Sequence, residues 1–587
     1  MVKILKNLTK TEFLLALVVI ALTCVQAFLD LTLPDYMSEI TLLVQTEGSV
    51  MSDIYVAGGK MVLCALGSLV ASLFVAIIAA RIASNFSFIV RSKLFQKVMG
   101  FSMKDVNSFS TASLITRTTN DVTQVQMLIV MGMQMLVKAP ITAVWAIAKI
   151  STKNSAWSVV TIVAVAVLLT IISTCLSLAV PRFKKLQVLT DNINRVSREH
   201  LDGLAVVRAY NAEEYQGEKF EVANDKLTKT NLFTSRTMSF LMPSMQMISS
   251  GLVLSVYLVG AVIINEAIGM DKITLFSDMV VYTAYAMQVV MSFIMLSMVF
   301  MILPRASVAA KRINEVLDRK ESIISGTKTS SDVAKVGEIE FKNVSFKYPD
   351  ADDYMLKNIN FTAKKGEVVA FIGSTGCGKS TVINLIPRFY DATDGEVLVG
   401  GMNVKEYSKT ALNAMIGYVS QKATLFTGTV ESNVVFGDNE NLNVKENHLE
   451  NSVQTAQADE FVQNLDEKYN SYVAQGGRNL SGGQKQRISI ARAVYRNPEI
   501  FIFDDSFSAL DYKTDRNLRH ALNNECKGST RIIVGQRIGT IREADKIIVL
   551  EDGEIVGMGK HKELLKNCET YYQIALSQLS EEELQNA

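Results

Sequence analysis

The chain has 587 residues, with 59 Lys and Arg against 58 Asp and Glu and a formal net charge of +1 at pH 7. This length exceeds what one hydrophobic core supports and predicts roughly two to four domains, and the balanced charge supplies no basic field that would recruit nucleic acid. The six cysteines follow no metal-ligand or paired spacing, which argues against a disulfide framework and favours buried, reduced thiols.

Composition divides the chain into an apolar first part and a second part with the character of a water-soluble domain. Up to about residue 305, long apolar runs alternate with charged stretches, whereas beyond about residue 335 short apolar runs alternate with Gly, Asp and Lys. We therefore predict an all-α transmembrane domain over residues 1–318, a Ser-, Lys- and Gly-rich linker over 319–337, and an α/β domain over 338–580.

Six apolar segments in the first part have the length that crosses about 30 Å of hydrocarbon. They lie near residues 12–31, 58–82, 130–152, 156–180, 238–264 and 275–303. Lys138 interrupts the third segment, and a lysine in the bilayer is costly unless it faces protein or water. Snorkelling or packing inside the bundle is the favoured interpretation of Lys138, and a functional role is the alternative.

Charge asymmetry between the connecting segments predicts the orientation of these helices. Residues 31–57 contain four carboxylates and no Lys or Arg, whereas residues 81–117 and 182–236 are rich in both basic residues. By the positive-inside rule, both long basic connections and both termini are cytoplasmic, in a multi-pass protein of the plasma or inner membrane. The apolar periodicity of these connections predicts helices that continue into the cytoplasm rather than disordered loops.

A glycine-rich segment in the second part lies between an apolar strand and a helix, the context that a phosphate-binding loop requires. Its glycines allow backbone N–H groups to converge on phosphate oxygens at a helix N-terminus. Lys379 would contact the β and γ phosphates, and the Ser380 hydroxyl would ligate Mg²⁺. The expected phosphate-binding residues are Gly373, Ser374, Thr375, Gly376, Cys377, Gly378, Lys379, Ser380 and Thr381.

A second buried-strand pattern, Ile500 to Asp504, ends in a carboxylate. Such a carboxylate supplies the acidic partner that a phosphate-bound Mg²⁺ needs. Together with the glycine-rich loop, Asp504 predicts a P-loop ATPase or GTPase.

The segment between these two motifs carries a family resemblance. Leu480-Ser-Gly-Gly-Gln484, followed by Lys-Gln-Arg-Ile-Ser-Ile-Ala-Arg, resembles the signature of the ATP-binding-cassette (ABC) transporters. The order of six spans, two long connections and one cassette is similar to the half-transporters of the exporter class. The resemblance covers nearly the whole chain and implies a six-helix transmembrane domain plus an α/β P-loop nucleotide-binding domain, with ATP and Mg²⁺ as cofactors.

The resemblance also assigns roles to individual residues. Tyr348 matches the aromatic residue that stacks on adenine, and Gln421 matches the glutamine that senses Mg²⁺ and the membrane domain. Asp511 ends a segment that resembles the family's loop communicating between the two nucleotide sites. In the family two halves meet head to tail, so each ATP lies between one chain's phosphate loop and the other's signature. The signature residues are Ser481, Gly482, Gly483 and Gln484, and the Mg²⁺ ligands are Ser380, Gln421 and Asp504.

Two positions depart from the family's catalytic pattern. Asp505 stands where efficient members carry a Glu base, and Gln536 stands where they carry a switch His. The Asp carboxylate is set back by about 1.5 Å, and misplacement of about 1 Å can cost on the order of a hundredfold in rate. Gln536 can donate a hydrogen bond but cannot carry imidazolium charge. Gln475 likewise replaces a Glu that many exporters have.

These departures, beside an intact signature, resemble the degenerate-site subunit of a bacterial heterodimeric multidrug-type exporter. We expect this chain to bind ATP and hydrolyse it poorly, with a second, non-identical half-transporter chain supplying the Glu and His. The lipid bilayer surrounds it, and the cargo is a small molecule, lipid or peptide of lipophilic or amphipathic character. The alternatives are a slow homodimeric exporter, a membrane-anchored nucleotide-sensing regulatory subunit, and an importer of exporter shape.

Overall fold

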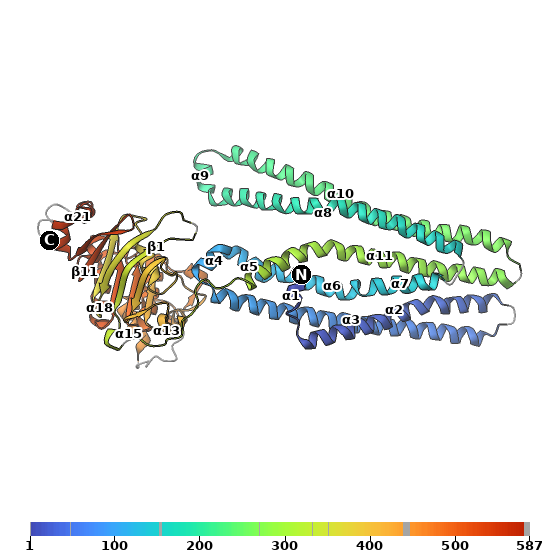
Figure 1. Ribbon diagram of the computed structural model, residues 1–587, viewed down its shortest axis with the longest axis horizontal. Helices are drawn as coiled ribbons and strands as arrows, with labels where there is room; N and C mark the ends of the chain where they lie inside the picture. Colours follow the sequence, from blue (N-terminus) through green and yellow to red (C-terminus); the bar gives the residue numbers. More distant parts are fainter. Residues whose placement is uncertain are drawn as a thin grey trace. The chain divides into compact units, whose positions relative to one another are not determined.

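The computed structural model describes residues 2–46, 49–151, 155–268, 270–331, 333–349, 351–437 and 447–579. The chain divides into two compact units. The helical unit comprises Met1–Met99 and Ala112–Arg319, and the sheet unit comprises Gly100–Thr111 and Lys320–Ala587. The short segment Gly100–Thr111 therefore clusters with the sheet unit, although the chain on both sides of it belongs to the helical unit (Figure 1).

Six helices among the described residues are long and apolar enough to cross a membrane, with lengths of 36 to 54 residues. Five are continuous: α2 (Lys10–Gln45), α3 (Met51–Gly100), α8 (Ser155–Asp202), α10 (Glu213–Glu266) and α11 (Met270–Leu317). The third span is α5 (Thr111–Thr116), η1 (Arg117–Asp121), α6 (Val122–Met131), η2 (Gly132–Leu136) and α7 (Lys138–Ser151). The predicted six-helix transmembrane domain is confirmed, and each helix exceeds the about 20 residues that a bilayer needs.

The remaining helices of the helical unit are short. They are α1 (Val2–Leu5) and α9 (Leu204–Ala209), while α4 (Met103–Phe109) belongs to the sheet unit. Helix α9 joins α8 to α10, which run side by side (Figure 1). Residues 152 and 580, which end two of the predicted segments, lie outside the described residues.

Two lysines of the membrane spans are paired with carboxylates. The Lys138 ammonium lies 2.9 Å from a carboxylate oxygen of Asp30, and the Lys149 ammonium lies 2.7 Å from Asp35. The Tyr285 hydroxyl donates to the other Asp35 oxygen at 2.5 Å. Pairing of this kind offsets the cost of charges at membrane depth, so Lys138 packs against a neighbouring helix.

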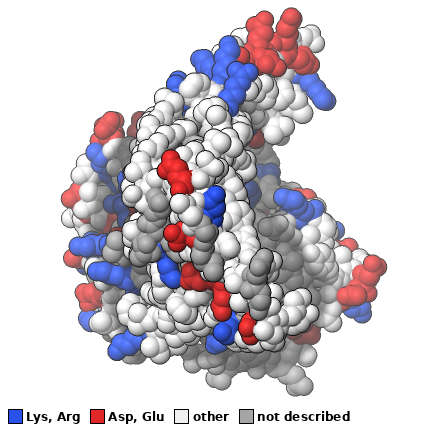
Figure 2. Space-filling view, turned by 90° about the vertical axis from the view of Figure 1, so that its right-hand side faces the viewer, with Lys and Arg blue, Asp and Glu red and all other residues white. Residues whose placement is uncertain are grey.

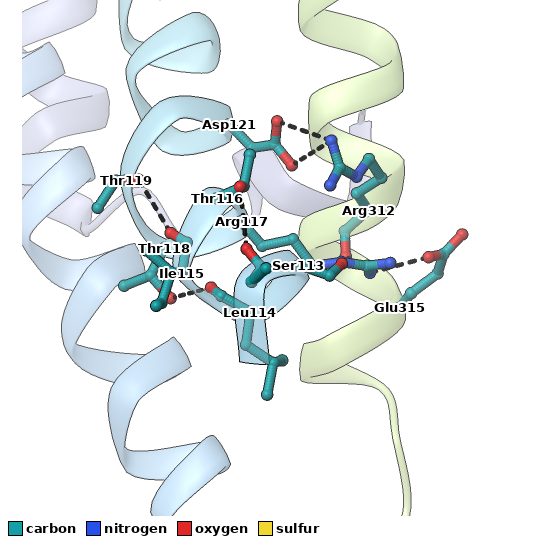
Figure 3. Close-up of polar contacts among 11 residues, drawn as sticks. Ser113, Leu114, Ile115, Thr116, Arg117, Thr118, Thr119, Asp121, Arg312 and Glu315 are labelled. Carbon is teal, nitrogen blue, oxygen red and sulfur yellow. Dashed lines mark hydrogen bonds and ion pairs between the residues drawn. The ribbon is translucent and has the colours of Figure 1, made fainter. Parts of the chain in front are cut away.

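The third span contains two π-helical turns, η1 and η2, which the sequence pattern did not predict. Around η1, the Arg117 guanidinium lies 2.9 Å from the Glu315 carboxylate and donates to the Arg312 carbonyl at 2.5 Å. The Arg312 guanidinium in turn lies 3.3 Å from Asp121 (Figure 3). Because a π turn changes which side chains share a face, η1 allows both charged residues of the turn to reach α11.

The sheet unit contains a six-stranded sheet in the order β12-β11-β3-β10-β9-β6. Its strands are β3 (Val368–Gly373), β6 (Ile416–Val419), β9 (Ile500–Asp504), β10 (Thr530–Val534), β11 (Lys546–Glu551) and β12 (Glu554–Gly559). All neighbours pair in parallel except β11 with β12. Every residue of β9 is buried, as expected of a parallel strand covered on both faces.

A second, antiparallel sheet runs in the order β2-β1-β4-β5, and β7 pairs with β8. These strands are β1 (Ile339–Phe346), β2 (Leu356–Ala363), β4 (Asp394–Val399), β5 (Met402–Asn403), β7 (Gly428–Thr429) and β8 (Tyr472–Val473). Alternate residues of β3 enter different cores, since Ala370 and Ile372 pack in one apolar cluster and Phe371 packs in the other.

Helices complete the sheet unit, and the predicted α/β fold is confirmed. They are α12 (Lys379–Leu385), α13 (Lys409–Ala414), α14 (Val430–Val434), α15 (His448–Thr455), α16 (Asp459–Gln463), α17 (Gly482–Tyr495), α18 (Tyr512–Glu525), α19 (Ile538–Ile541), α20 (His561–Asn567) and α21 (Glu569–Leu576).

Figure 2 views the molecule from the right-hand side of Figure 1. Basic and acidic side chains are interspersed on the face that it shows, without a continuous basic patch on that face.

Candidate functional site

The candidate site lies at the carboxyl ends of three neighbouring parallel strands. Val534 of β10 pairs with Phe371 of β3 on one side and with Asp504 of β9 on the other. The loops that follow these strands therefore emerge at the same edge, where ligands bind in open α/β sheets. This register brings together the phosphate loop, the acidic pair Asp504 and Asp505, and Gln536.

The phosphate loop follows β3 and opens helix α12. Gly376 and Gly378 have φ of +88° and +100°, left-handed values that favour glycine. A Cβ at Gly373 would approach the Leu550 carbonyl oxygen to 2.1 Å, so only glycine fits there. The Lys379 ammonium donates to the carbonyl oxygens of Gly373 and Ser374 at 2.8 and 2.7 Å. The loop has the glycine conformation that a phosphate cradle requires, and phosphate binding by Lys379 and the loop stays a prediction.

The predicted Mg²⁺ ligands Ser380 and Asp504 are neighbours. The Ser380 hydroxyl donates to an Asp504 carboxylate oxygen at 2.9 Å. Burial raises the pKa of the Asp504 carboxyl, and the charge of Asp505 adds to the rise while the Ser380 hydrogen bond opposes it. Among the described residues no cluster of three or more His, Cys, Asp or Glu side chains could hold a metal. A hydroxyl and one carboxylate suit Mg²⁺, which binds through few protein ligands plus phosphates and water.

Asp505 is held by two side-chain amides. Gln536 donates to its Oδ2 atom at 2.8 Å, and Gln421 donates to the same oxygen at 3.3 Å. Asp505 is 9% exposed and has a φ of +46°. Burial raises the pKa of its carboxyl more than the hydrogen bond from Gln421 and the charge of Lys379 lower it. The structure therefore brings both departures from the family pattern, Asp505 and Gln536, into direct contact.

Tyr348 lies beside the helix that begins at the phosphate loop. Its hydroxyl shares a hydrogen bond of 3.0 Å with the Thr381 hydroxyl. Thr381 is buried in the first turn of α12, two residues after Lys379. The predicted adenine platform and the phosphate loop are thus directly connected.

The signature residues form a separate feature. Ser481 caps helix α17, and its hydroxyl accepts from the Gln484 N–H at 3.3 Å while the Gln484 amide oxygen accepts from the Ser481 N–H at 2.9 Å. This capping box leaves Gly482 and Gly483 in the first turn of α17. Asp511 likewise caps α18 by accepting from the Thr514 N–H at 2.9 Å, and Gln475 begins a short 3₁₀ turn.

One contact at the site was missed at the sequence level. The Gln578 amide nitrogen donates to the Gln536 carbonyl at 2.8 Å, and its amide oxygen accepts from the Ile538 N–H at 2.8 Å. A cavity of about 570 Å³ adjoins this contact, and Ser374, Gln536 and Gln578 are among the residues that line it. Gln578 follows α21 and carries no motif, so only the folded chain reveals its proximity to Gln536.

Sequence and structure comparisons agree with this geometry. Residues 356–508 match the family described as ABC transporter, and residues 16–293 match the ABC transporter transmembrane region. An uncharacterized ABC transporter ATP-binding protein of Mycobacterium tuberculosis is 37% identical, covering 89% of this chain and 87% of the relative. The ATP-dependent lipid A-core flippase of Pseudomonas aeruginosa is 30% identical, covering 88% and 83%. A bacterial Atm1-family ABC exporter solved with ATP bound superposes with a TM-score of 0.81 at 21% identity, covering 97% of this chain and 100% of that chain.

Proposed function

Because the chain belongs to the ABC transporter family, as an exporter half-transporter with fused transmembrane and ATP-binding domains, we propose that it exports a lipophilic or amphipathic small molecule, lipid or peptide as one subunit of a heterodimer. In this proposal its own phosphate loop binds ATP but hydrolyses it slowly. Its signature serves the hydrolytic site of a second, non-identical chain. Both termini lie in the cytoplasm, as the distribution of basic residues indicates.

The observation that carries this proposal is the contact of Asp505 with Gln536 and Gln421. A general base must lie within hydrogen-bond reach of the proton that it abstracts. The Asp505 carboxylate is one methylene shorter than Glu, and its Oδ2 atom accepts from Gln536 at 2.8 Å and from Gln421 at 3.3 Å. Water beside the γ phosphate would therefore lack a well-placed proton acceptor.

The remaining residues perform binding rather than bond cleavage. Lys379 and the loop N–H groups hold the β and γ phosphates, and Tyr348 stacks on adenine. Mg²⁺ bound with ATP would neutralise part of the phosphate charge. Ser380, Gln421 and Asp504 would hold that ion.

In the proposed cycle the two cassettes close on ATP and drive the helices from an inward-facing to an outward-facing state. Hydrolysis at the partner's phosphate loop, against Ser481 and Gly482 of this chain, then resets the transporter. The name of the Pseudomonas aeruginosa relative, a lipid A-core flippase, supports a lipid or another amphiphile as cargo.

A slow homodimeric exporter is the second candidate. One observation favours it: burial raises the pKa of the Asp505 carboxyl, and a higher pKa makes a carboxylate a better base near neutral pH. In this case two copies of the chain would form two equal sites, and each would use Asp505 as a weak base.

ATP turnover by the purified full-length chain in lipid nanodiscs separates the two candidates. The heterodimer proposal expects ATP binding with little turnover by this chain alone, and turnover only with the second chain present. Rapid turnover by this chain alone, abolished by Asp505→Ala, would replace it with the homodimer.

A further inference from the structure

The ring of Tyr348 is held between two other aromatic rings of the sheet unit. Phe346 meets it edge-on with centroids 4.8 Å apart, and Tyr390 meets it edge-on at 5.4 Å with an interplanar angle of 86°. Tyr390 also contacts Phe346 at 5.6 Å. Such edge-to-face pairs are favourable because the positive ring edge meets the negative ring face. Phe346 and Tyr390 therefore fix the orientation of Tyr348.

The hydroxyl of Tyr390 points to a different part of the chain. The Asn107 side-chain amide donates to it at 3.3 Å. Asn107 lies on α4 (Met103–Phe109), in the connection between the second and third membrane spans. One side chain, Tyr390, thus contacts the predicted adenine platform through its ring and a membrane-span connection through its hydroxyl.

Helix α4 is anchored to the rest of the sheet unit by a buried carboxylate. Asp105 is fully buried and accepts from the Ser322 N–H at 3.0 Å and from the Ser322 hydroxyl at 2.9 Å. Burial by itself raises the pKa of the Asp105 carboxyl, but the hydrogen bonds from Ser322 and Ser102 outweigh it and leave this pKa lowered. Asp105 therefore stays ionised, and Lys409 adds a hydrogen bond to the Gly100 carbonyl at 2.9 Å. The Asn107 amide is held at a defined position.

We propose that Tyr390 is a positioning residue of the ATP site with two separable roles. Its ring holds Tyr348 in the orientation that receives adenine, and its hydroxyl transmits a change of that orientation to α4 through Asn107. When adenine stacks on Tyr348, the edge contact passes the resulting shift of the Tyr348 ring to Tyr390. The inference rests on the adenine-binding role of Tyr348 within the proposed function, but not on the heterodimer.

The two roles are separated by two substitutions at the same position. Tyr390→Leu removes the ring contact, and it should raise the Kd for ATP about 2- to 10-fold, the value of one aromatic pair. Tyr390→Phe keeps the ring and removes only the hydroxyl, so the Kd for ATP should stay within about twofold. The full-length chain in lipid nanodiscs is titrated with a fluorescent ribose-labelled ATP analogue and with unlabelled ATP as competitor.

The second role is measured at α4 by hydrogen–deuterium exchange with and without saturating ATP. We expect ATP to change deuterium uptake in peptides spanning residues 103–109 of the unmodified chain, and Tyr390→Phe and Asn107→Ala each to abolish this change. The double variant should equal either single one, because both remove the same hydrogen bond. Tyr354→Phe is the matched control, since the exposed Tyr354 hydroxyl donates to Asp394 at 3.0 Å and, among the described residues, not to α4.

An unchanged ATP effect on α4 in Tyr390→Phe, or an unchanged Kd in Tyr390→Leu, would overturn the inference. Thermal unfolding of each variant shows whether it is folded, and the conservative Tyr390→Phe change keeps the test usable if Tyr390→Leu does not fold. Rapid ATP turnover by this chain alone would contradict the heterodimer proposal but not the proposed role of Tyr390. The two failures are therefore distinguishable.

Discussion

The phosphate loop and the signature loop both present the N-terminus of a helix, but their surroundings differ. The phosphate loop opens α12 among side chains from three strand ends, with Ser380 bonded to Asp504 and Gln536 bonded to Asp505. The signature opens α17 and is capped by its own Ser481 and Gln484. Backbone N–H groups suffice to bind a phosphate, whereas hydrolysis needs a positioned base. The phosphate-loop region can therefore lose its base while the signature loop keeps its ability to contact a phosphate.

The largest expected effect comes from restoring the base at the phosphate loop. Asp505→Glu together with Gln536→His should raise ATP turnover at this site on the order of a hundredfold, because the added methylene moves the carboxylate toward the attacking water. Steady-state phosphate release measures it in the two-chain complex in nanodiscs, with the second chain's own catalytic Glu replaced by Gln so that only this site is read. Adding Lys379→Ala to the pair must remove the gain. A pair that binds ATP and gains no turnover would show that the reach of Asp505 does not limit hydrolysis.

A smaller effect is expected at the signature. Ser481→Ala should leave ATP binding by this chain's own phosphate loop unchanged and lower turnover of the two-chain complex about tenfold, the value of one hydrogen bond to a charged group. Ser408→Ala is the matched control, because Ser408 caps α13 in the same way, with the Ala411 N–H donating to its hydroxyl at 3.2 Å. Equal losses in the two variants would mean that the lost cap alone explains the result.

The sequence predicted those parts of the molecule that depend on local pattern. Long apolar runs predicted six membrane helices, and a strand, glycine loop and helix in succession predicted the cradle around Lys379. Asp504 was predicted because it ends a short apolar run. Each of these signals lies within one contiguous segment, so the chain order alone contains it.

Contacts between distant segments were not predictable in the same way. Asn107 and Tyr390 are 283 positions apart, and Gln578 and Gln536 are 42 positions apart. The clustering of Gly100–Thr111 with the sheet unit and the π turn at Arg117–Asp121 depend on which partners the folded chain offers. Neither Asn107 nor Gln578 stands in a motif. Tertiary packing rather than local propensity brings each of them to its partner.

The acidic pair at the phosphate loop predicts a pH-dependent stability. Because burial raises the pKa of the Asp504 carboxyl, its charged form is disfavoured in the folded chain, and stability falls as pH rises through that raised pKa. Asp504→Asn should therefore raise the Tm of the nucleotide-free protein at pH 7 by about 2–4 °C, the shift that about 1 kcal/mol gives. Differential scanning calorimetry should show this difference vanish below the ordinary Asp pKa. A gain that persists there would exclude the carboxylate charge as its cause.

The smallest expected effect concerns the backbone around Gln536. It distinguishes the contact that holds this backbone from the chemistry of the Gln536 side chain. Gln578 holds the Gln536 carbonyl and the Ile538 N–H at 2.8 Å each, so it fixes the backbone from which the Gln536 amide projects. Gln578→Ala should lower the preference for ATP over ADP about 2- to 5-fold, because a Gln536 amide that is no longer held in place discriminates the γ phosphate less well. The size of the effect follows from the about 0.5–1.5 kcal/mol that a neutral hydrogen bond contributes.

The matched control is Gln573→Ala, since the Gln573 amide donates to Glu569 on its own helix at 2.6 Å. Competition of ATP and ADP against a labelled analogue gives the ratio of the two Kd values for each variant. If Gln573→Ala and Gln578→Ala shift that ratio equally, α21 acts only through its fold. If only Gln578→Ala shifts it, Gln578 itself contributes to the discrimination between ATP and ADP at the phosphate loop. The signature is capped by its own Ser481 and Gln484 and needs no such contact from another segment.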